Sequence, residues 1–396
     1  MTDSPRSPAP ADFSPFEGGG LFRLLRLVGL SGDAPGQVRR RVITIVLVAW
    51  LPLAVLAAAE GSLYGDSISV PFLLDAEAHI RFLVVLPLLI LAEVEVHRRL
   101  PELLRQFAER GLVTQLEGPR FDAIVSSGFR VRNSVLPEIL ILAIVYGVGI
   151  FVVWRQFLML DAATWYSAPA AGGRALTLAG HWYGYVSLPI VQFLLLRWYF
   201  RLLLWSRLLW QLSRLKLDLT PAHPDRAGGL GFLADVGYAF AMLALAHGAL
   251  AAGYMASRIF FEGATMPQFG QAIAAVVVFM QFVVFGPMLF FAGGLLDARY
   301  AGLIRYGTLA DRYVRGFDAK WTSGQPSGEP LLGSPDIQSL ADLANSFEVV
   351  HSMRLTPITL HSATRLAIAT LLPVAPLLLT AVPLNEALKM LFGLVL

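Results

Sequence analysis

Residues 272–296 read AIAAVVVFMQFVVFGPMLFFAGGLL and contain no charged side chain. A helix of about 20 apolar residues is long enough to cross the hydrocarbon core of a bilayer. The composition agrees, because the chain of 396 residues is 56% hydrophobic and 15% charged, and its mean hydropathy is +0.62. The sequence therefore predicts an all-α fold, a polytopic bundle of transmembrane helices.

Six further apolar segments complete a predicted bundle of seven transmembrane helices. They are residues 42–59, 82–96, 135–153, 182–215, 232–256 and 366–382, of which 182–215 continues as a helix beyond the membrane. Residues 387–396 are apolar but too few to cross the membrane. The predicted region 42–296 thus holds six membrane helices with helical cytoplasmic loops, and 366–396 holds the seventh helix and a short tail.

The distribution of Lys and Arg predicts the orientation of the bundle, because short cytoplasmic loops carry an excess of these residues. Of the 31 basic residues, five fall on one side of the predicted membrane and all the others on the opposite side; the five are Arg81, Arg155, Arg174, Arg258 and Lys389. We therefore expect a bacterial cytoplasmic membrane protein with a cytoplasmic N-terminus and an external C-terminus.

Other segments are predicted to lie outside the membrane. Residues 1–20 are rich in Pro, Ser and Gly and are predicted to be disordered, and residues 21–41 predict a basic amphipathic helix on the inner membrane surface. Pro101 is expected to open a short helix at 102–111. Residues 297–365 predict a cytoplasmic helical segment with a Gly, Pro and Ser linker, in which Ser334 caps a helix that starts at Pro335. Together these segments predict a layer of helices on the cytoplasmic surface of the bilayer.

The densest polar stretch between the apolar segments is residues 215–231, which read LKLDLTPAHPDRAGGLG. Its glycines permit a turn that points several backbone N–H groups toward one place, at the start of a membrane helix. The stretch predicts an anion site for a phosphate or a lipid headgroup, formed by His223, Asp225, Arg226, Gly228, Gly229 and Gly231. The alternative is a structural turn in which Asp225 caps the next helix.

Ionisable side chains within membrane helices are costly, so each indicates either ion pairing or function. They are Glu93, Glu95, Glu138, Arg197, Arg201, Asp235, His247 and Asp297. Arg197 and Arg201 are expected to pair with the carboxylates across helices, or else the group lines a hydrophilic cavity on the cytoplasmic side. His247 is expected to bond to a neighbouring helix, with a proton relay as the alternative.

Two further features bear on function. Pro and Gly residues inside the membrane helices predict bends that serve as a hinge or gate; the strongest are Gly286, Pro287, Pro373 and Pro376. The first external loop is acidic, with Glu60, Asp66, Asp75 and Glu77 opposed only by Arg81. It is either an ordinary external loop or a vestibule that concentrates cations.

The chain contains no Cys, and its His residues lack the spacing of metal ligands, so we predict no metal and no cofactor. The leading interpretation is a channel or transporter for ions, gated through the cytoplasmic helical layer and assembled as a homo-oligomer. The alternatives are a membrane enzyme or binding protein for a lipid-linked phosphate at 215–231, and a signalling scaffold. The expected partners are the lipid bilayer and anionic lipid headgroups, and no nucleic acid.

Overall fold

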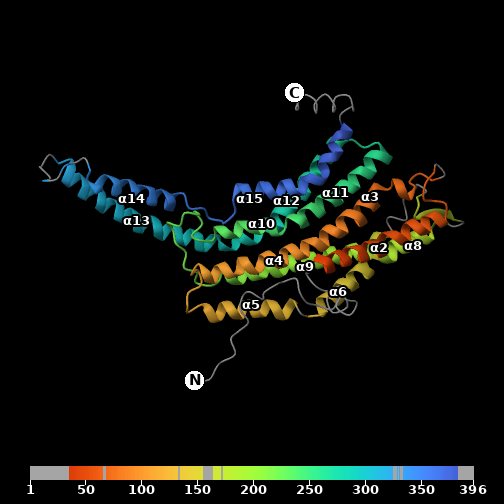
Figure 1. Ribbon diagram of the computed structural model, residues 1–396, viewed down its shortest axis with the longest axis horizontal. Coiled ribbons are helices and arrows are strands. Elements are labelled where there is room, and N and C mark those ends of the chain that lie inside the picture. Colours follow the sequence, from red (N-terminus) through yellow and green to blue (C-terminus); the bar gives the residue numbers. More distant parts are fainter. Residues whose placement is uncertain are drawn as a thin grey trace, which may run out of the picture.

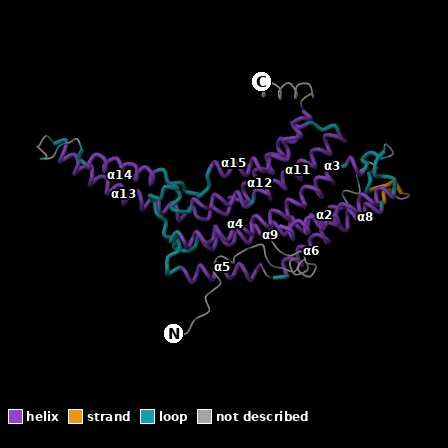
Figure 2. The backbone as a smooth tube through the Cα atoms, in the orientation of Figure 1, coloured by secondary structure: helices purple, strands orange, loops and turns teal. Residues whose placement is uncertain are grey.

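The computed structural model describes residues 35–65, 68–132, 134–154, 164–170, 173–323, 328, 330 and 333–381. Within these ranges the chain is mostly helical, and its strands form one short hairpin at an end of the bundle (Figure 2). The predicted all-α class is therefore confirmed. Residues 1–34 and the tail at 387–396 lie outside the described residues, whereas Arg39, Arg40 and Arg41 belong to a helix that begins at Pro35.

The elements follow one another in the order of the sequence. The first part contains α2 (Pro35–Ala59), η2 (Phe72–Leu74), α3 (Ala76–His79), η3 (Ile80–Val85), α4 (Leu86–Glu109), α5 (Gly118–Arg132), α6 (Leu136–Ile144) and η4 (Val145–Trp154). The antiparallel strands β1 (Ser167–Ala170) and β2 (Gly173–Leu176) follow. The second part contains α8 (Leu178–Trp182), η5 (Tyr183–Ser187), α9 (Leu188–Leu212), η6 (Gly231–Asp235), α10 (Val236–Ala239), α11 (Ala241–Glu262), η7 (Met266–Phe269), α12 (Gly270–Phe285), η8 (Gly286–Phe291), α13 (Ala292–Trp321), α14 (Pro335–His351), α15 (Leu360–Leu371) and η9 (Leu372–Ala381).

Four helical runs among the described residues are long and apolar enough to cross a membrane, namely Gly36–Ala59, Leu178–Leu212, Met266–Trp321 and Leu360–Thr380. A fifth is formed by Gly231–Ala239 and Ala241–Glu262, which are bent by 46° relative to each other. The chain is thus a helical membrane protein, but the seven predicted crossings are not confirmed. The predicted helices at 82–96 and 135–153 fall in a charged run and in a short apolar helix, respectively.

The helices are arranged in three layers (Figure 1). The central layer contains α2, α4 and α9, and α11 packs on α4 from one side together with α10, α12 and α15. On the other side, α5 and α6 pack against α9. This arrangement buries one face of α4 and of α9, so Glu93, Arg197 and Arg201 on these helices face protein rather than lipid.

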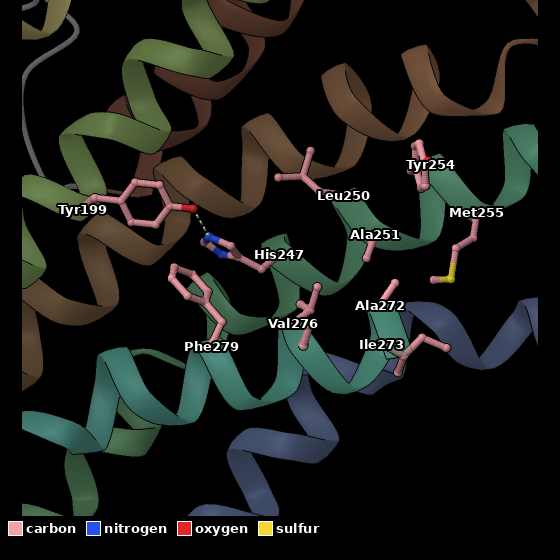
Figure 3. A pocket seen from close by; sticks show the side chains of 11 residues that line it. Tyr199, His247, Leu250, Ala251, Tyr254, Met255, Ala272, Ile273, Val276 and Phe279 are labelled. Atoms are coloured by element: carbon pink, nitrogen blue, oxygen red, sulfur yellow. Dashed lines mark hydrogen bonds between the residues drawn. The ribbon is translucent and has the colours of Figure 1, made fainter. Parts of the chain in front are cut away.

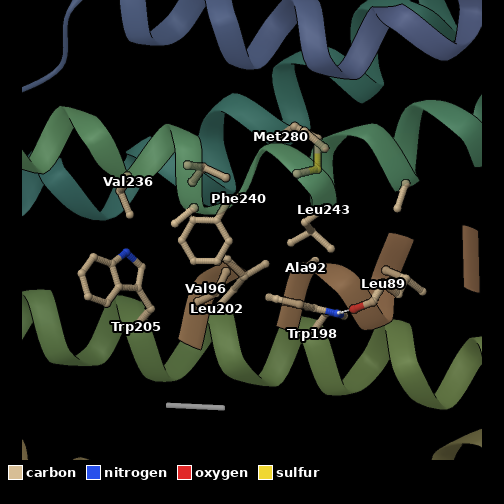
Figure 4. Close-up of a cluster of buried hydrophobic side chains, with 14 of the residues drawn as sticks. Leu89, Ala92, Val96, Trp198, Leu202, Trp205, Val236, Phe240, Leu243 and Met280 are labelled. Carbon is tan, nitrogen blue, oxygen red and sulfur yellow. Dashed lines mark hydrogen bonds between the residues drawn. The ribbon is translucent and has the colours of Figure 1, made fainter. Parts of the chain in front are cut away.

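The core between the layers is aromatic and aliphatic (Figure 4). Trp198 and Trp205 project from α9 toward Phe240 and Leu243, and all four side chains are buried. The indole N–H of Trp198 donates to the carbonyl oxygen of Leu89 at 3.0 Å. Close packing and hydrogen bonds of this kind hold membrane helices together, since lipid offers the same apolar surroundings as the core.

An antiparallel helical hairpin, α13 with α14, projects beyond the bundle at the left of Figure 1. As predicted, α14 begins after the capping residue Ser334, whose hydroxyl accepts the N–H of Asp336. At the hairpin tip Asp336 Oδ2 accepts from Lys320 Nζ at 2.8 Å and from Trp321 Nε1 at 2.9 Å. The helix α13 is continuous with the membrane helix before it.

The prediction that Pro101 opens a new helix is wrong, because Pro101 lies inside α4. A proline removes one backbone hydrogen bond from a helix interior. Here the flanking side chains of Leu100, Leu103, Leu104 and Phe107 are all buried, so packing keeps the helix in one piece. The predicted membrane helix at 82–96 and the predicted cytoplasmic helix therefore belong to one helical run, in which η3 leads directly into α4.

Candidate functional site

A cavity of about 470 Å³, whose largely apolar wall carries several polar and charged side chains, lies at the end of the bundle opposite the α13–α14 hairpin. Its walls come from α3, η3, the segment around β1, α9 and α11. We call it the polar cavity, and its ionisable and polar wall residues include Asp75, Glu77, Arg81, Tyr166, Tyr183, Gln192, Arg258 and Glu262. Ligand sites are commonly cavities of this size in which a few polar groups converge.

Two of these wall residues stand on π-helical turns. Arg81 lies in η3 and Tyr183 begins η5, and Arg81 Nη1 donates to the Tyr183 hydroxyl at 2.5 Å. Each wide turn is followed by a proline near the start of the next α-helix, Pro87 in one case and Pro189 in the other. A proline cannot complete the regular bonding pattern of the turn before it. Single π-helical turns occur frequently at functional sites.

The buried side chain of Trp165 lies next to the polar cavity and fixes one of its wall residues, Asp75. Its indole N–H donates to Asp75 Oδ2 at 2.8 Å, while Asp75 Oδ1 caps α3 by accepting the N–H of Ala78 at 2.9 Å. The rings of Tyr166 and Tyr183 stack with their centres 5.6 Å apart. Burial raises the pKa of the Tyr166 hydroxyl, and the carboxylate of Asp75 raises it further, so this phenol remains a neutral hydrogen-bond donor.

The charges around the polar cavity do not balance. Among the described residues, three carboxylates and two guanidinium groups line it. Glu77 pairs with Arg81 on the next helical turn, and Glu262 pairs with Arg258 at 3.0 Å. The remaining carboxylate is that of Asp75, whose described bonds are from neutral N–H groups. The described residues of the cavity wall therefore carry one excess negative charge, which favours a cation or a zwitterion over an anion.

A second cavity, of about 460 Å³, lies between α9, α11 and α12 and has mainly apolar walls (Figure 3). We call it the apolar cavity. At one end Tyr199 and His247 face each other, with their Oη and Nε2 atoms 2.8 Å apart. His247 Nδ1 lies 2.8 Å from the carbonyl oxygen of Leu243, which can only accept, so Nδ1 donates there and Nε2 accepts the Tyr199 proton.

Only some of the predicted ionisable residues come together. Glu93, Glu138, Arg197 and Arg201 are brought together, and Arg41 of α2 joins them, as the ion-pair interpretation expects. Glu95 instead pairs with Arg98 and Arg99 on its own helix, while Asp235 and Asp297 are exposed. His247 bonds to Tyr199 of a neighbouring helix.

The buried group is centred on one carboxylate. Glu93 Oε1 lies 2.9 Å from Arg197 Nη1 and 2.5 Å from Arg201 Nη1, and Glu93 Oε2 lies 3.8 Å from Arg41 Nη2. Arg197 Nε also lies 3.6 Å from Glu138 Oε1. These residues, which we call the Glu93 cluster, join α2, α4, α6 and α9. Such a cluster compensates charges that lipid could not solvate.

The stretch 215–231 turns its amides toward its own side chain. Asp225 Oδ1 accepts from the N–H groups of Ala227 at 2.8 Å and Gly229 at 3.2 Å, and Oδ2 accepts from Gly231 at 2.8 Å. His223 Nδ1 lies 2.9 Å from Asp225 Oδ1. The groups expected to face an external anion thus surround Asp225, which favours the structural-turn interpretation.

The turn at residues 215–231 also connects the α13–α14 hairpin to the bundle. Arg354, in the connection between α14 and α15, donates from Nη2 to the Asp225 carbonyl at 2.8 Å, and its N–H donates to the Arg226 carbonyl at 2.7 Å. Arg226 has a positive φ of 53°, and Gly228 and Gly229 have φ values of 64° and 97°. The glycines are needed for this left-handed backbone.

Replacing Asp225 with alanine is expected to lower the free energy of unfolding by about 2–3 kcal/mol, because several partly buried N–H groups lose their acceptor. Burial by itself raises the pKa of this carboxyl, but the N–H groups of Ala227, Gly231 and Gly229 lower it below its ordinary value. The Asp225 carboxyl therefore binds a proton more readily in the unfolded chain than in the folded protein. The contribution of ionised Asp225 to the free energy of unfolding is thus present above about pH 4 and is lost as the pH falls through the folded-state pKa. Thermal unfolding of wild type and variant from pH 7 to pH 3 measures both effects. An equal loss of stability with acid in the two proteins would contradict this role.

The predicted helix breakers coincide with changes in helix type. Gly286 and Pro287 start the 3₁₀ segment η8, and Pro373 and Pro376 lie in the 3₁₀ segment η9. The helix axis nevertheless continues through η8 into α13. Within the described residues these positions thus mark places where the regular α-helical hydrogen bonds are interrupted.

Comparison of the chain with known protein families, with curated proteins and with solved structures gives no match. The function must therefore be argued from the geometry. Sequence reasoning missed the polar cavity, because Arg81, Tyr183 and Tyr254 come from segments far apart in the chain. A sequence signal did exist for part of it, namely Asp75 and Glu77 in the acidic loop and the prolines Pro87 and Pro189 that follow η3 and η5.

Proposed function

We propose that this protein is a transport protein of the bacterial cytoplasmic membrane that takes an organic cation from the external side into the polar cavity. The observation that carries the proposal is the charge imbalance of this cavity, with three carboxylates against two guanidinium groups. The volume of about 470 Å³ far exceeds that of a bare metal ion and suits a small organic molecule. The ring of Tyr254 in the cavity wall already holds one cation, because the guanidinium of Arg258 lies over it, 4.9 Å from the ring centre.

The proposed orientation follows the distribution of basic residues. The polar cavity is formed partly by the acidic first loop, on the side that is poor in Lys and Arg, so it opens externally. The α13–α14 hairpin then lies in the cytoplasm. Two more elements cross the membrane in this proposal, the run 76–109 and the run 136–154, which makes seven crossings. The Glu93 cluster supports this, because it neutralises charges on α4 that would otherwise oppose insertion.

The test uses purified protein in liposomes and measures uptake of radiolabelled tetraethylammonium. We expect saturable uptake in wild type, and no uptake of chloride. Glu77→Gln, which removes one negative charge but retains an acceptor for Arg81, is expected to reduce uptake at least tenfold, as loss of a desolvated charge partner does. Asp318→Asn is the control, because this exposed carboxylate lies on the hairpin far from the cavity.

Two outcomes would overturn the proposal. One is wild-type protein without saturable uptake of the cation. The other is equal uptake by wild type and Glu77→Gln, which would show that the carboxylates of the polar cavity do not select the solute. Reversal potentials under opposed K⁺ and Cl⁻ gradients give an independent measure of selectivity, and a preference for Cl⁻ would also contradict a cation site.

A further inference from the structure

We infer that the transported cation is amphiphilic, with a charged head in the polar cavity and an apolar tail in the apolar cavity. This inference rests on the proposed function. Its basis is that the two cavities adjoin each other, since Leu250 and Tyr254 of α11 form part of the wall of both. The structure thus places a charged chamber next to an apolar one, and this combination matches the two parts of a single amphiphilic molecule.

The side chains of α11 give the direction of the molecule. Arg258, Tyr254, Leu250 and His247 follow one another at steps of three or four residues, so they lie along one face of the helix. Arg258 lies at the polar end and His247 at the apolar end, and the helix rises about 16 Å between them. A cationic head beside the carboxylate of Glu77, at the Arg258 end of this face, leaves the tail directed toward His247.

The chemistry of the apolar cavity fits a tail and does not fit a second polar group. Its walls are largely aliphatic, with Val276 and Ile273 of α12 opposite Ala251 of α11 (Figure 3). The polar atoms of Tyr199 and His247 bond to each other, and the remaining imidazole N–H bonds to the Leu243 carbonyl. These groups have no need of a polar ligand, so burial of methylene groups is the interaction that the cavity offers.

The location of the tail can be tested with dodecyltrimethylammonium that carries a photoreactive diazirine at the end of its chain. The protein is held in lipid nanodiscs, illuminated and digested. We expect labelled peptides from α9, α11 and α12 that include Tyr199, His247 or Val276. Excess unlabelled dodecyltrimethylammonium is expected to prevent this labelling, whereas labelling by lipid-dissolved probe is not saturable.

A pair of variants on one helix tests the same point by affinity. The Val276→Trp side chain fills the apolar cavity. The affinity of this variant for dodecyltrimethylammonium is expected to be at least tenfold lower than that of wild type, because each methylene buried in the cavity raises the binding constant about fourfold. Its uptake of tetraethylammonium, which has no long tail, is expected to stay at the wild-type level. Val278→Trp is the control, because Val278 is 65% exposed and lies outside the cavity wall.

The outcomes separate the inference from the proposed function. The inference would be overturned if the probe labels the face of α12 that carries Val278, or if excess unlabelled amphiphile does not reduce the labelling. Either result would show that the tail lies in lipid. Tetraethylammonium uptake that persists in that case leaves the proposed function in place. If wild-type protein takes up neither cation, the proposed function fails and the inference fails with it.

Discussion

Glu93→Ala is expected to lower the free energy of unfolding by about 3–5 kcal/mol, the cost of leaving buried charges without their partner. In the native protein Arg197 and Arg201 both bond to Glu93, and the guanidinium of Arg41 lies 3.8 Å from it. Glu138 is the only other carboxylate that the described residues bring into this cluster, and it lies beside Arg197. Without Glu93 three guanidinium groups face one carboxylate in the interior, and thermal unfolding in detergent measures the loss.

Glu95 provides a matched control, since it is the same residue type two positions further along α4. It pairs with Arg98 and Arg99, which are substantially exposed, so Glu95→Ala is expected to cost less than about 1 kcal/mol. A double variant, Glu93→Ala with Arg201→Met, is expected to recover part of the loss because it also removes an uncompensated charge. Equal destabilisation by Glu93→Ala and Glu95→Ala would refute the central role of Glu93.

The second large effect is expected for Gly248→Ala, which should lower the free energy of unfolding by about 3 kcal/mol or more. A methyl group at Gly248 would lie 1.9 Å from the carbonyl oxygen of Thr370 in α15, far inside contact distance. Neither partner can rotate away, because both are backbone groups of packed helices, so α11 and α15 must separate. This contact belongs to the main interface between α15 and the bundle.

Gly270→Ala serves as the comparison, because nothing lies within 4 Å of a methyl group placed there. Alanine favours the helix more than glycine does, so this variant is expected to be neutral or up to about 1 kcal/mol more stable. The yield of monodisperse protein and its midpoint of thermal unfolding distinguish the two variants. Similar midpoints for Gly248→Ala and wild type would show that α15 does not pack as closely as the structure describes.

The sequence predicted features that depend on neighbouring residues in the chain, and one distant pairing that follows from the cost of an unpaired charge in lipid. The apolar run at 272–296 predicted a membrane helix, and Ser334 with Pro335 predicted the start of α14. Arg197, Arg201 and Glu93 were expected to pair because lipid cannot solvate their charges, and the structure brings them together. In these cases local pattern and simple electrostatics were sufficient.

Features that depend on packing between distant segments were not predicted. The stretch 215–231 predicted either an anion site or a structural turn with Asp225 as a cap, and only the folded chain shows that Asp225 itself accepts these amides. Pro101 was expected to start a helix because its buried neighbours were unknown. The polar cavity likewise joins Arg81 to Tyr183, which are separated by 102 residues.

The α13–α14 hairpin has a mechanical consequence. The 30 residues of α13 extend about 45 Å from the 3₁₀ segment at Gly286, in line with the helix that carries Val276. A tilt of about 10° at that segment sweeps the far end through roughly 8 Å, given the same helical rise. Small angular changes at η8 would therefore become displacements of several ångströms at the far end of the hairpin.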